Sequence, residues 1–208
     1  SDTGFSAIVE SCQLLIKFQA DFNGTSAAVL DLMGLQISPE LEILLGMCPH
    51  CTDAHVAAIT TCASKLNHIR IGESDINTDL ALCSIGANLP GLTTISIQIC
   101  SNVGYAGIEA LVRACPLLTE IHLGMCPKVC DRCLDAIATH SKQLRDLAVT
   151  DNDVITDKDV RKLAKMCTQL AFVNFDFTEI TELAVKYLIN NCSQLNTFWF
   201  GGRGAVSP

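Results

Sequence analysis

The sequence predicts an α/β fold, a right-handed β/α solenoid (a horseshoe) with a parallel sheet on its concave face and helices on its convex face. The main observation is an internal repeat, because leucines return at a nearly constant spacing along the whole chain. The intervals are 26, 25, 26, 26, 26, 26 and 25 residues between Leu15, Leu41, Leu66, Leu92, Leu118, Leu144, Leu170 and Leu195. Stacked units bury one continuous core, so we expect residues 1–208 to form a single domain of about seven to eight repeats.

Each unit is expected to contain a short strand and a helix. After Cys115, the apolar residues Ile121 and Leu123 alternate with polar ones as in a half-buried strand, and a helical pattern follows Val129. Residues 107–115 show the same amphipathic helical pattern in the unit before. The spacing predicts strands centred near residues 17, 43, 69, 95, 121, 147, 173 and 198, each except the last followed by a convex helix.

Four of the predicted helices begin with a hydroxyl residue followed by an acidic one. A hydroxyl group there accepts hydrogen bonds from free amide groups of the first turn, and a carboxylate favours the positive end of the helix dipole. These starts are Thr52-Asp53, Thr78-Asp79, Thr156-Asp157 and Thr181-Glu182. No such turn is legible in residues 23–35, and Ser74 replaces the Cys or Asn expected after a strand. The turns in 23–35 and 74–82 are therefore expected to be irregular.

Both ends of the sequence depart from a complete unit. Residues 1–12 match the turn and helix half of a repeat, which favours a fragment of a longer protein with further repeats upstream. At the other end Trp199 and Phe200 close the last predicted strand, and residues 201–208 are expected to form a Gly-rich tail without a capping helix.

The composition narrows the classes of function. Hydrophobic residues make up 49% of the chain and charged residues 17%, which excludes a disordered segment. The net charge of −8 lacks the positive field that binds nucleic acid, and no run reaches the roughly 18 apolar residues of a membrane helix. We therefore expect no nucleic-acid or membrane partner. The twelve cysteines lie within apolar periodic segments without a secretory signal, which favours a reducing compartment, the cytoplasm or the nucleus.

Most cysteines occupy two repeated positions that favour a structural role. Small, weakly polar thiols suit both positions, which are expected to be buried. The cysteines follow a strand at Cys48, Cys100 and Cys126, and they end a helix at Cys12, Cys115, Cys167 and Cys192.

A zinc site is the alternative interpretation, because residues 48–51 and 126–133 contain ligand-like cysteine spacings. Cys48 and Cys126 are equivalent positions three units apart, which is roughly 15 Å at a strand spacing of about 4.8 Å. Zinc ligands lie about 2.0 to 2.3 Å from the ion, so these two clusters cannot share one. No metal site is predicted.

The remaining cysteines include three near predicted helix starts. Cys51 and Cys130 fall in the turn before a helix, and Cys133 is equivalent in register to His55 and Asp159, positions expected to be exposed. A helix N-terminus lowers the pKa of a thiol, so a reactive thiol at Cys133 is the alternative to a structural one.

No catalytic arrangement follows from the polar residues. The five histidines fall on different repeats and faces, and no Ser or Cys is placed by the register to pair with one as a nucleophile. Gly201-Gly202-Arg203-Gly204 ends the chain instead of opening a helix, so it is not a phosphate-binding motif. We expect no enzyme activity, no catalytic residues and no cofactor.

The surface that the sheet creates is the candidate binding site. Strand residues alternate between core and solvent, so those beside the apolar positions line the concave face. In its C-terminal third, large aromatic residues flanked by acidic ones are typical of a hot spot for a protein partner, here one with a basic segment. The candidate residues are Glu120, His122, Asp146, Asp151, Phe172, Asn174, Asp176, Phe177 and Trp199. The alternative is that the rings close the open end of the solenoid against the Gly-rich tail.

The unit that begins at Cys115 reads C-x2-L-x2-I-x-L-x2-C, and the next unit leads through Ile155, Thr156 and Asp157 into its helix. This pattern resembles the cysteine-containing class of leucine-rich repeats, found largely in F-box/leucine-rich-repeat proteins. The resemblance implies the substrate-recognition repeats of an F-box-type ubiquitin-ligase subunit, with a Skp1-type adaptor bound through a region upstream of this chain. The alternative is a structural scaffold subunit of a cytoskeletal, axonemal or other multiprotein assembly. Both functions are non-catalytic and require a protein partner.

Overall fold

Eight strands form one parallel sheet whose spatial order follows the sequence, β1 to β8. The computed structural model describes residues 2–12, 14–21, 31, 38, 41, 43–47, 50–73 and 78–201. The strands are β1 (Lys17–Asp21), β2 (Ile43–Met47), β3 (His68–Gly72), β4 (Thr94–Gln98), β5 (Glu120–Gly124), β6 (Asp146–Thr150), β7 (Phe172–Asn174) and β8 (Thr197–Trp199). Every predicted strand centre lies within its strand, so the parallel order and the register are confirmed.

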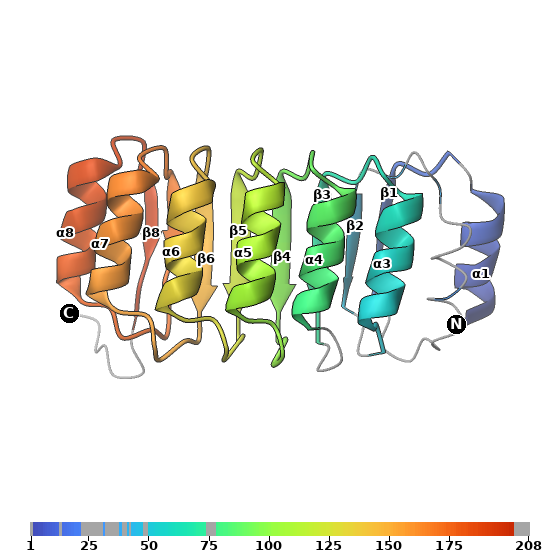
Figure 1. Cartoon of the computed structure of the whole chain (residues 1–208), viewed down its shortest axis with the longest axis horizontal. Helices are drawn as coiled ribbons and strands as arrows, with labels where there is room; N and C mark the ends of the chain where they lie inside the picture. Colours follow the sequence, from blue (N-terminus) through green and yellow to red (C-terminus); the bar gives the residue numbers. More distant parts are fainter. Residues whose placement is uncertain are drawn as a thin grey trace.

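The helices stand in one row on one side of the sheet (Figure 1). They are α1 (Asp2–Ser11), α3 (Asp53–Cys62), α4 (Asp79–Asn88), α5 (Tyr105–Ala114), α6 (Asp131–His140), α7 (Asp157–Met166) and α8 (Glu182–Asn191). A helix follows each of β2 to β7 as predicted, and α1 is the helical half-unit expected before the first strand. Most residues between β1 and β2, including the predicted irregular turn in 23–35, lie outside the described part. We call the sheet surface opposite the helices the concave face.

The core lies between the sheet and the row of helices. In β5, Ile121 and Leu123 are buried on the helix side, whereas Glu120 and His122 are half-buried on the concave face. The strand partners repeat this pattern, since Ile121 lies beside Ile95 of β4. Equivalent apolar side chains therefore stack from repeat to repeat, and burial of this continuous apolar surface stabilises the array.

The repeated cysteines are mostly buried, as predicted, and their thiols also make hydrogen bonds. Cys115, which ends α5, donates its thiol to the carbonyl of Leu89 in the preceding repeat at 3.3 Å, and burial raises its pKa to about 11. Cys126 donates to the carbonyl of Gly124 at 3.3 Å, and burial also raises its pKa to about 11. Cys12 is the exception, because it is exposed at the end of α1, the first helix of the chain. The prediction that Cys12 is buried is wrong, and Cys48 lies outside the described residues.

The acidic residue at a helix start bonds to the next repeat. Asp53, at the start of α3, accepts hydrogen bonds from the backbone amides of Thr78 at 2.8 Å and Ala81 at 3.1 Å. Its other carboxylate oxygen accepts from the hydroxyl of Thr78 at 2.7 Å. One carboxylate therefore satisfies free donors at the N-terminus of α4 and ties two helices together.

The same bond recurs at two further joints between helices. Asp79 of α4 accepts from the backbone amide of Gly104, which precedes α5, at 2.7 Å. Asp157 of α7 accepts from the amide and the hydroxyl of Thr181, which precedes α8, at 2.8 and 2.6 Å. These carboxylates were expected to act on their own helices, but they reach the start of the next helix along the array.

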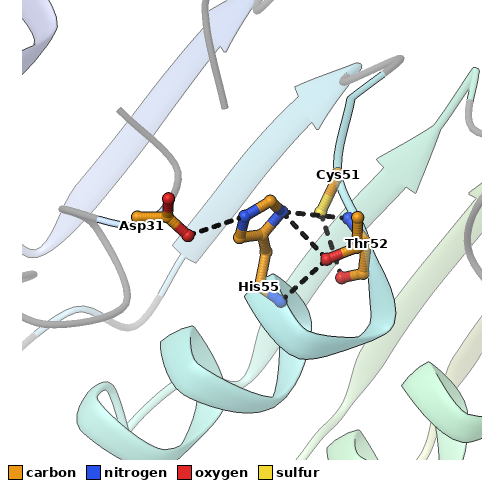
Figure 2. Close-up of polar contacts among 4 residues, drawn as sticks. All are labelled: Asp31, Cys51, Thr52 and His55. Carbon is orange, nitrogen blue, oxygen red and sulfur yellow. Dashed lines mark hydrogen bonds and ion pairs between the residues drawn. The ribbon is translucent and has the colours of Figure 1, made fainter. Parts of the chain in front are cut away.

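Three helices, α3, α6 and α7, carry a capping box within their own first turn. At α3 the ring of His55 turns back to Thr52, and its Nδ1 accepts the backbone amide of Thr52 at 3.1 Å (Figure 2). The other ring nitrogen, Nε2, lies 2.9 Å from Oδ1 of Asp31. Asp159 makes the equivalent bond in α7, accepting the amide of Thr156 at 2.9 Å.

This geometry corrects the prediction that Cys133 and its equivalents His55 and Asp159 are exposed. Cys133, His55 and Asp159 are buried, because a side chain in the third position of these helices folds back over the turn. Cys51, which precedes the N-cap residue of α3, is buried as well. Burial raises the pKa of Cys133 to about 12, opposite to the lowered pKa considered for a reactive thiol. The Cys133 thiol is therefore shielded from water, with its sulfur 3.9 Å from that of Cys130.

The turn expected to be irregular in 74–82 is partly regular. Thr78 caps α4 through its side chain, which accepts from the backbone amide of Leu80, and residues 79–82 form the first turn of an ordinary helix. Residues 74–77 lie outside the described part of the chain.

Removing one inter-repeat cap tests this arrangement. Asp53→Ala is expected to lower the free energy of unfolding by about 1–2 kcal/mol, because it leaves donors at the start of α4 unsatisfied. The matched control is Asp131→Ala at the same position of α6, where the carboxylate accepts from the amide of Arg132 in its own turn. We expect a loss of less than about 0.5 kcal/mol there. Urea unfolding monitored by circular dichroism measures both, and equal losses would contradict the inter-repeat cap.

Candidate protein-interaction face

The strand register brings most of the predicted site residues together on the concave face. Glu120, Asp146 and Phe172 lie side by side as the first residues of β5, β6 and β7. Two strand positions further on, His122 lies opposite Ala148, which in turn lies opposite Asn174, and Asn174 lies opposite Trp199 of β8. The C-terminal half of the concave face therefore presents acidic and aromatic residues in two neighbouring rows.

Two of these residues bond to each other. Nε2 of His122 lies 3.0 Å from Oδ1 of Asp146, and the two side chains are 32% and 29% exposed. The bond links β5 to β6 across the concave face and leaves both groups in reach of a partner. It holds the Asp146 carboxylate in one orientation, next to Glu120 in the adjacent strand.

The aromatic residues at the end of the sheet form an edge-to-face pair. The ring centroids of Phe172 and Trp199 are 5.8 Å apart with the planes at 64°. Phe172 is half-buried, whereas Trp199 is 54% exposed. Such pairs fix both rings, so Trp199 presents an ordered apolar surface. Residues 202–208, against which the rings were expected to close in the alternative interpretation, lie outside the described part.

Phe177 and Asp151 belong to a line of residues with an unusual backbone. Just after successive strands, Glu73, Ile99, Met125, Asp151 and Phe177 have φ between 53° and 57°. We call these five residues the strand-exit ridge. The backbone amide of each donates to a carbonyl of the next repeat, for example from Ile99 to Gly124 at 2.9 Å. Positive φ is costly for side-chain-bearing residues, and above all for the β-branched Ile99, so these hydrogen bonds hold a strained line of side chains.

The strand-exit ridge adds Ile99 and Met125 to the binding residues that were predicted from the sequence. Ile99 is 40% exposed and Met125 is 52% exposed, compared with 46% for Phe177. The repeat length could have identified them, because steps of 26 residues back from Phe177 reach Asp151, Met125 and Ile99. Exposed apolar side chains that follow one another on a strained backbone indicate a binding surface more strongly than scattered surface hydrophobics do.

The other predicted residues have partners within the turn after β7. Oδ1 of Asn174 accepts the backbone amide of Asp176 at 2.9 Å, and the carbonyl of Asp176 accepts the amide of Asp151 at 3.0 Å. Asn174 therefore shapes the turn that leads to Phe177. The carboxylates of Asp151 and Asp176 follow equivalent strands at one edge of the face and are half-buried.

Among the described residues, no group of three or more His, Cys, Asp or Glu side chains is placed to hold a metal ion. None of the helices that the structure describes combines the length and apolar character needed to cross a bilayer.

Comparisons with known proteins agree with this architecture. No family model matches the chain. It is 32% identical over 117 residues to the F-box/LRR-repeat protein 4 of Bos taurus, a match that covers 54% of this chain and 19% of that protein. In the crystal structure of the Rad7 and Elc1 complex in yeast, one chain superimposes with a TM-score of 0.67 at 19% identity, covering 79% of this chain and 42% of that one. The chain thus spans less than half the length of these two relatives. With the repeat length, the sheet order and the sequence match in agreement, this chain is a leucine-rich-repeat domain similar to those of F-box/leucine-rich-repeat proteins.

Proposed function

We propose that this domain is a non-catalytic protein-interaction domain that holds the substrate of an F-box-type ubiquitin ligase on its concave face. The likeness to an F-box/LRR-repeat protein supports the interaction role. The observation that carries the proposal is the strand-exit ridge, which exposes the apolar side chains of Ile99, Met125 and Phe177 from a strained backbone.

The chemistry of the face defines the partner. Apolar anchors on the strand-exit ridge and at Trp199 require apolar side chains in the bound segment. The acidic residues of the candidate face favour Lys or Arg in the same segment and speed its association at low salt; they are Glu120, Asp146, Asp151 and Asp176. The expected partner segment is therefore both apolar and basic.

The first test separates the concave face from the convex one. Phe177→Ala in the full-length protein is expected to weaken partner binding by at least about 1–2 kcal/mol, because it removes an exposed aromatic anchor. The matched control is Leu183→Ala, on the convex helix α8, since Leu183 and Phe177 are both 46% exposed. Co-precipitation from cells followed by calorimetric titration of the recovered partner measures both. Equal binding by the two variants would show that the partner does not contact the strand-exit ridge.

A second test separates the ligase role from the scaffold alternative. In the ligase role, the full-length protein binds a Skp1-type adaptor, and ubiquitin transfer to the recovered partner requires Phe177. Partner binding that depends on Phe177, without adaptor binding or ubiquitin transfer, would support a scaffold subunit with the same binding face.

A further inference from the structure

Two cysteines meet at the start of α6. Cys130 is the N-cap residue and Cys133 occupies the third helical position, with their sulfur atoms 3.9 Å apart. The backbone amide of Cys130 also donates to the sulfur of Cys133 at 3.4 Å. The two thiols thus take the places of the hydroxyl and carboxyl groups in an ordinary capping box.

We propose that Cys130 and Cys133 are a redox-active dithiol site, which low-molecular-weight disulfides convert into an intramolecular disulfide bond. This inference concerns the convex side of the array and does not depend on the concave binding face.

The fold holds the two side chains together. At the same positions of α7, Oγ1 of Thr156 donates to Oδ2 of Asp159 at 3.0 Å, and at α3, Oγ1 of Thr52 lies 3.1 Å from Nδ1 of His55. The N-cap and third side chains therefore face each other in all three capping boxes. A disulfide requires the sulfur atoms to approach to about 2.05 Å, which small rotations of two short side chains provide.

The two thiols differ in their exposure to solvent, and this difference determines which of them reacts first. Cys130 is half-buried and lies at the helix N-terminus, so it meets the reagent first. Cys133 is fully buried, and burial raises its pKa to about 12, so external reagents do not reach it directly. It reacts as the second thiol, once a mixed disulfide has formed beside it.

The reaction proceeds in two balanced steps. The Cys130 thiolate attacks one sulfur of oxidised glutathione, forms a mixed disulfide and releases one glutathione thiolate. The Cys133 thiol then gives its proton to water and attacks the Cys130 sulfur, which releases the second glutathione thiolate. The two cysteines lose two electrons and two protons in total, and the glutathione disulfide is reduced to two thiols.

Tryptic mapping provides a direct test, because Arg132 lies between the two cysteines. Trypsin separates residues 129–132 from residues 133–142, so a Cys130–Cys133 disulfide leaves these two peptides joined. The folded protein is incubated with oxidised glutathione at pH 8, and free thiols are blocked before digestion. We expect the joined pair in the parent protein and its loss after treatment with a reducing agent.

Three variants make the test specific. Cys130→Ser abolishes the joined pair and keeps a preferred N-cap residue. Cys133→Ala also abolishes it, and it leaves a stable glutathione adduct on Cys130; alanine fits this position, which Ala81 and Ala184 occupy in α4 and α8. Cys83→Ser, at an exposed cysteine of α4, is the control and keeps the pair.

Two results would overturn the proposal. One is a glutathione adduct that persists on Cys130 in the parent protein, since Cys133 then does not react. The other is a joined pair that forms only after the protein is unfolded with urea.

Discussion

Phe175→Ala is expected to lower the free energy of unfolding by about 3–5 kcal/mol, the largest effect of any substitution considered for this domain. Phe175 is fully buried just after β7, where it continues the column of Ile97, Leu123 and Val149 from the preceding repeats. Its backbone bonds, from its amide to the carbonyl of Trp199 and from the hydroxyl of Thr178 to its own carbonyl, do not involve the ring. The loss therefore reports the cavity that the ring leaves between sheet and helix.

Phe177→Ala is the matched control two residues further on. It removes the same ring from an exposed position, so the free energy of unfolding is expected to change by less than about 0.5 kcal/mol. Urea unfolding of both variants measures the difference. A large loss for Phe177→Ala would place that ring in the core and remove it from the binding face, and a small loss for Phe175→Ala would contradict the packing described here.

Gly107→Ala is expected to destabilise the domain by about 1–3 kcal/mol, although alanine is the better helix former by about 0.5–1 kcal/mol. Gly107 lies in the first turn of α5, and a β-carbon there would lie 2.7 Å from both the Cα and a carboxylate oxygen of Asp79. The Cα belongs to the backbone of α4 and cannot move aside. The added methyl group therefore pushes α5 away from α4 and disturbs the cap that Asp79 provides to Gly104.

Gly91→Ala is the matched control, because it replaces a glycine by alanine without a steric clash. An added β-carbon at Gly91, in the turn after α4, meets no atom within 4 Å. We expect a change within about 0.5 kcal/mol. Thermal unfolding of both variants compares them, and a stabilised Gly107→Ala protein would show that the two helices are less closely packed than the structure indicates.

The repeat made the fold predictable from the sequence. Because Leu118 and its equivalents recur every 25 or 26 residues, one recognised strand at Ile121 and Leu123 placed all eight strands. The concave position of Glu120, His122 and Asp146 followed from the alternation of side chains along a strand. These inferences needed only periodicity, which a single sequence contains.

Contacts between neighbouring repeats were not predictable in the same way. Cys133 was expected at the surface because it lies near the start of a helix, but its side chain folds back over the first turn toward Cys130 and is buried. Asp53 was expected to cap its own helix, yet its carboxylate reaches Thr78. Periodicity defines which residues are equivalent, whereas the direction of a side chain depends on the neighbour it packs against.

The inter-repeat caps link some neighbouring helices of the row and leave others without such a link. Carboxylates tie α3 to α4, α4 to α5, and α7 to α8, but α6 and α7 are capped within their own first turns. Besides the packing of its buried residues, α6 contacts α7 through the exposed pair of Lys162 and Asp135 at 2.7 Å and α5 through Arg132, which stacks on Tyr105 at 3.8 Å.

Exposed ion pairs weaken as salt rises, whereas the hydrogen bonds of the sheet persist. The sheet is continuous through β4, β5 and β6, with five paired residues at each step. At high ionic strength we therefore expect α6 to exchange its amide protons sooner than the helices on either side. The two joints on either side of α6, to α5 and to α7, lack an inter-repeat carboxylate cap, so we expect the curvature of the binding face to change most easily there.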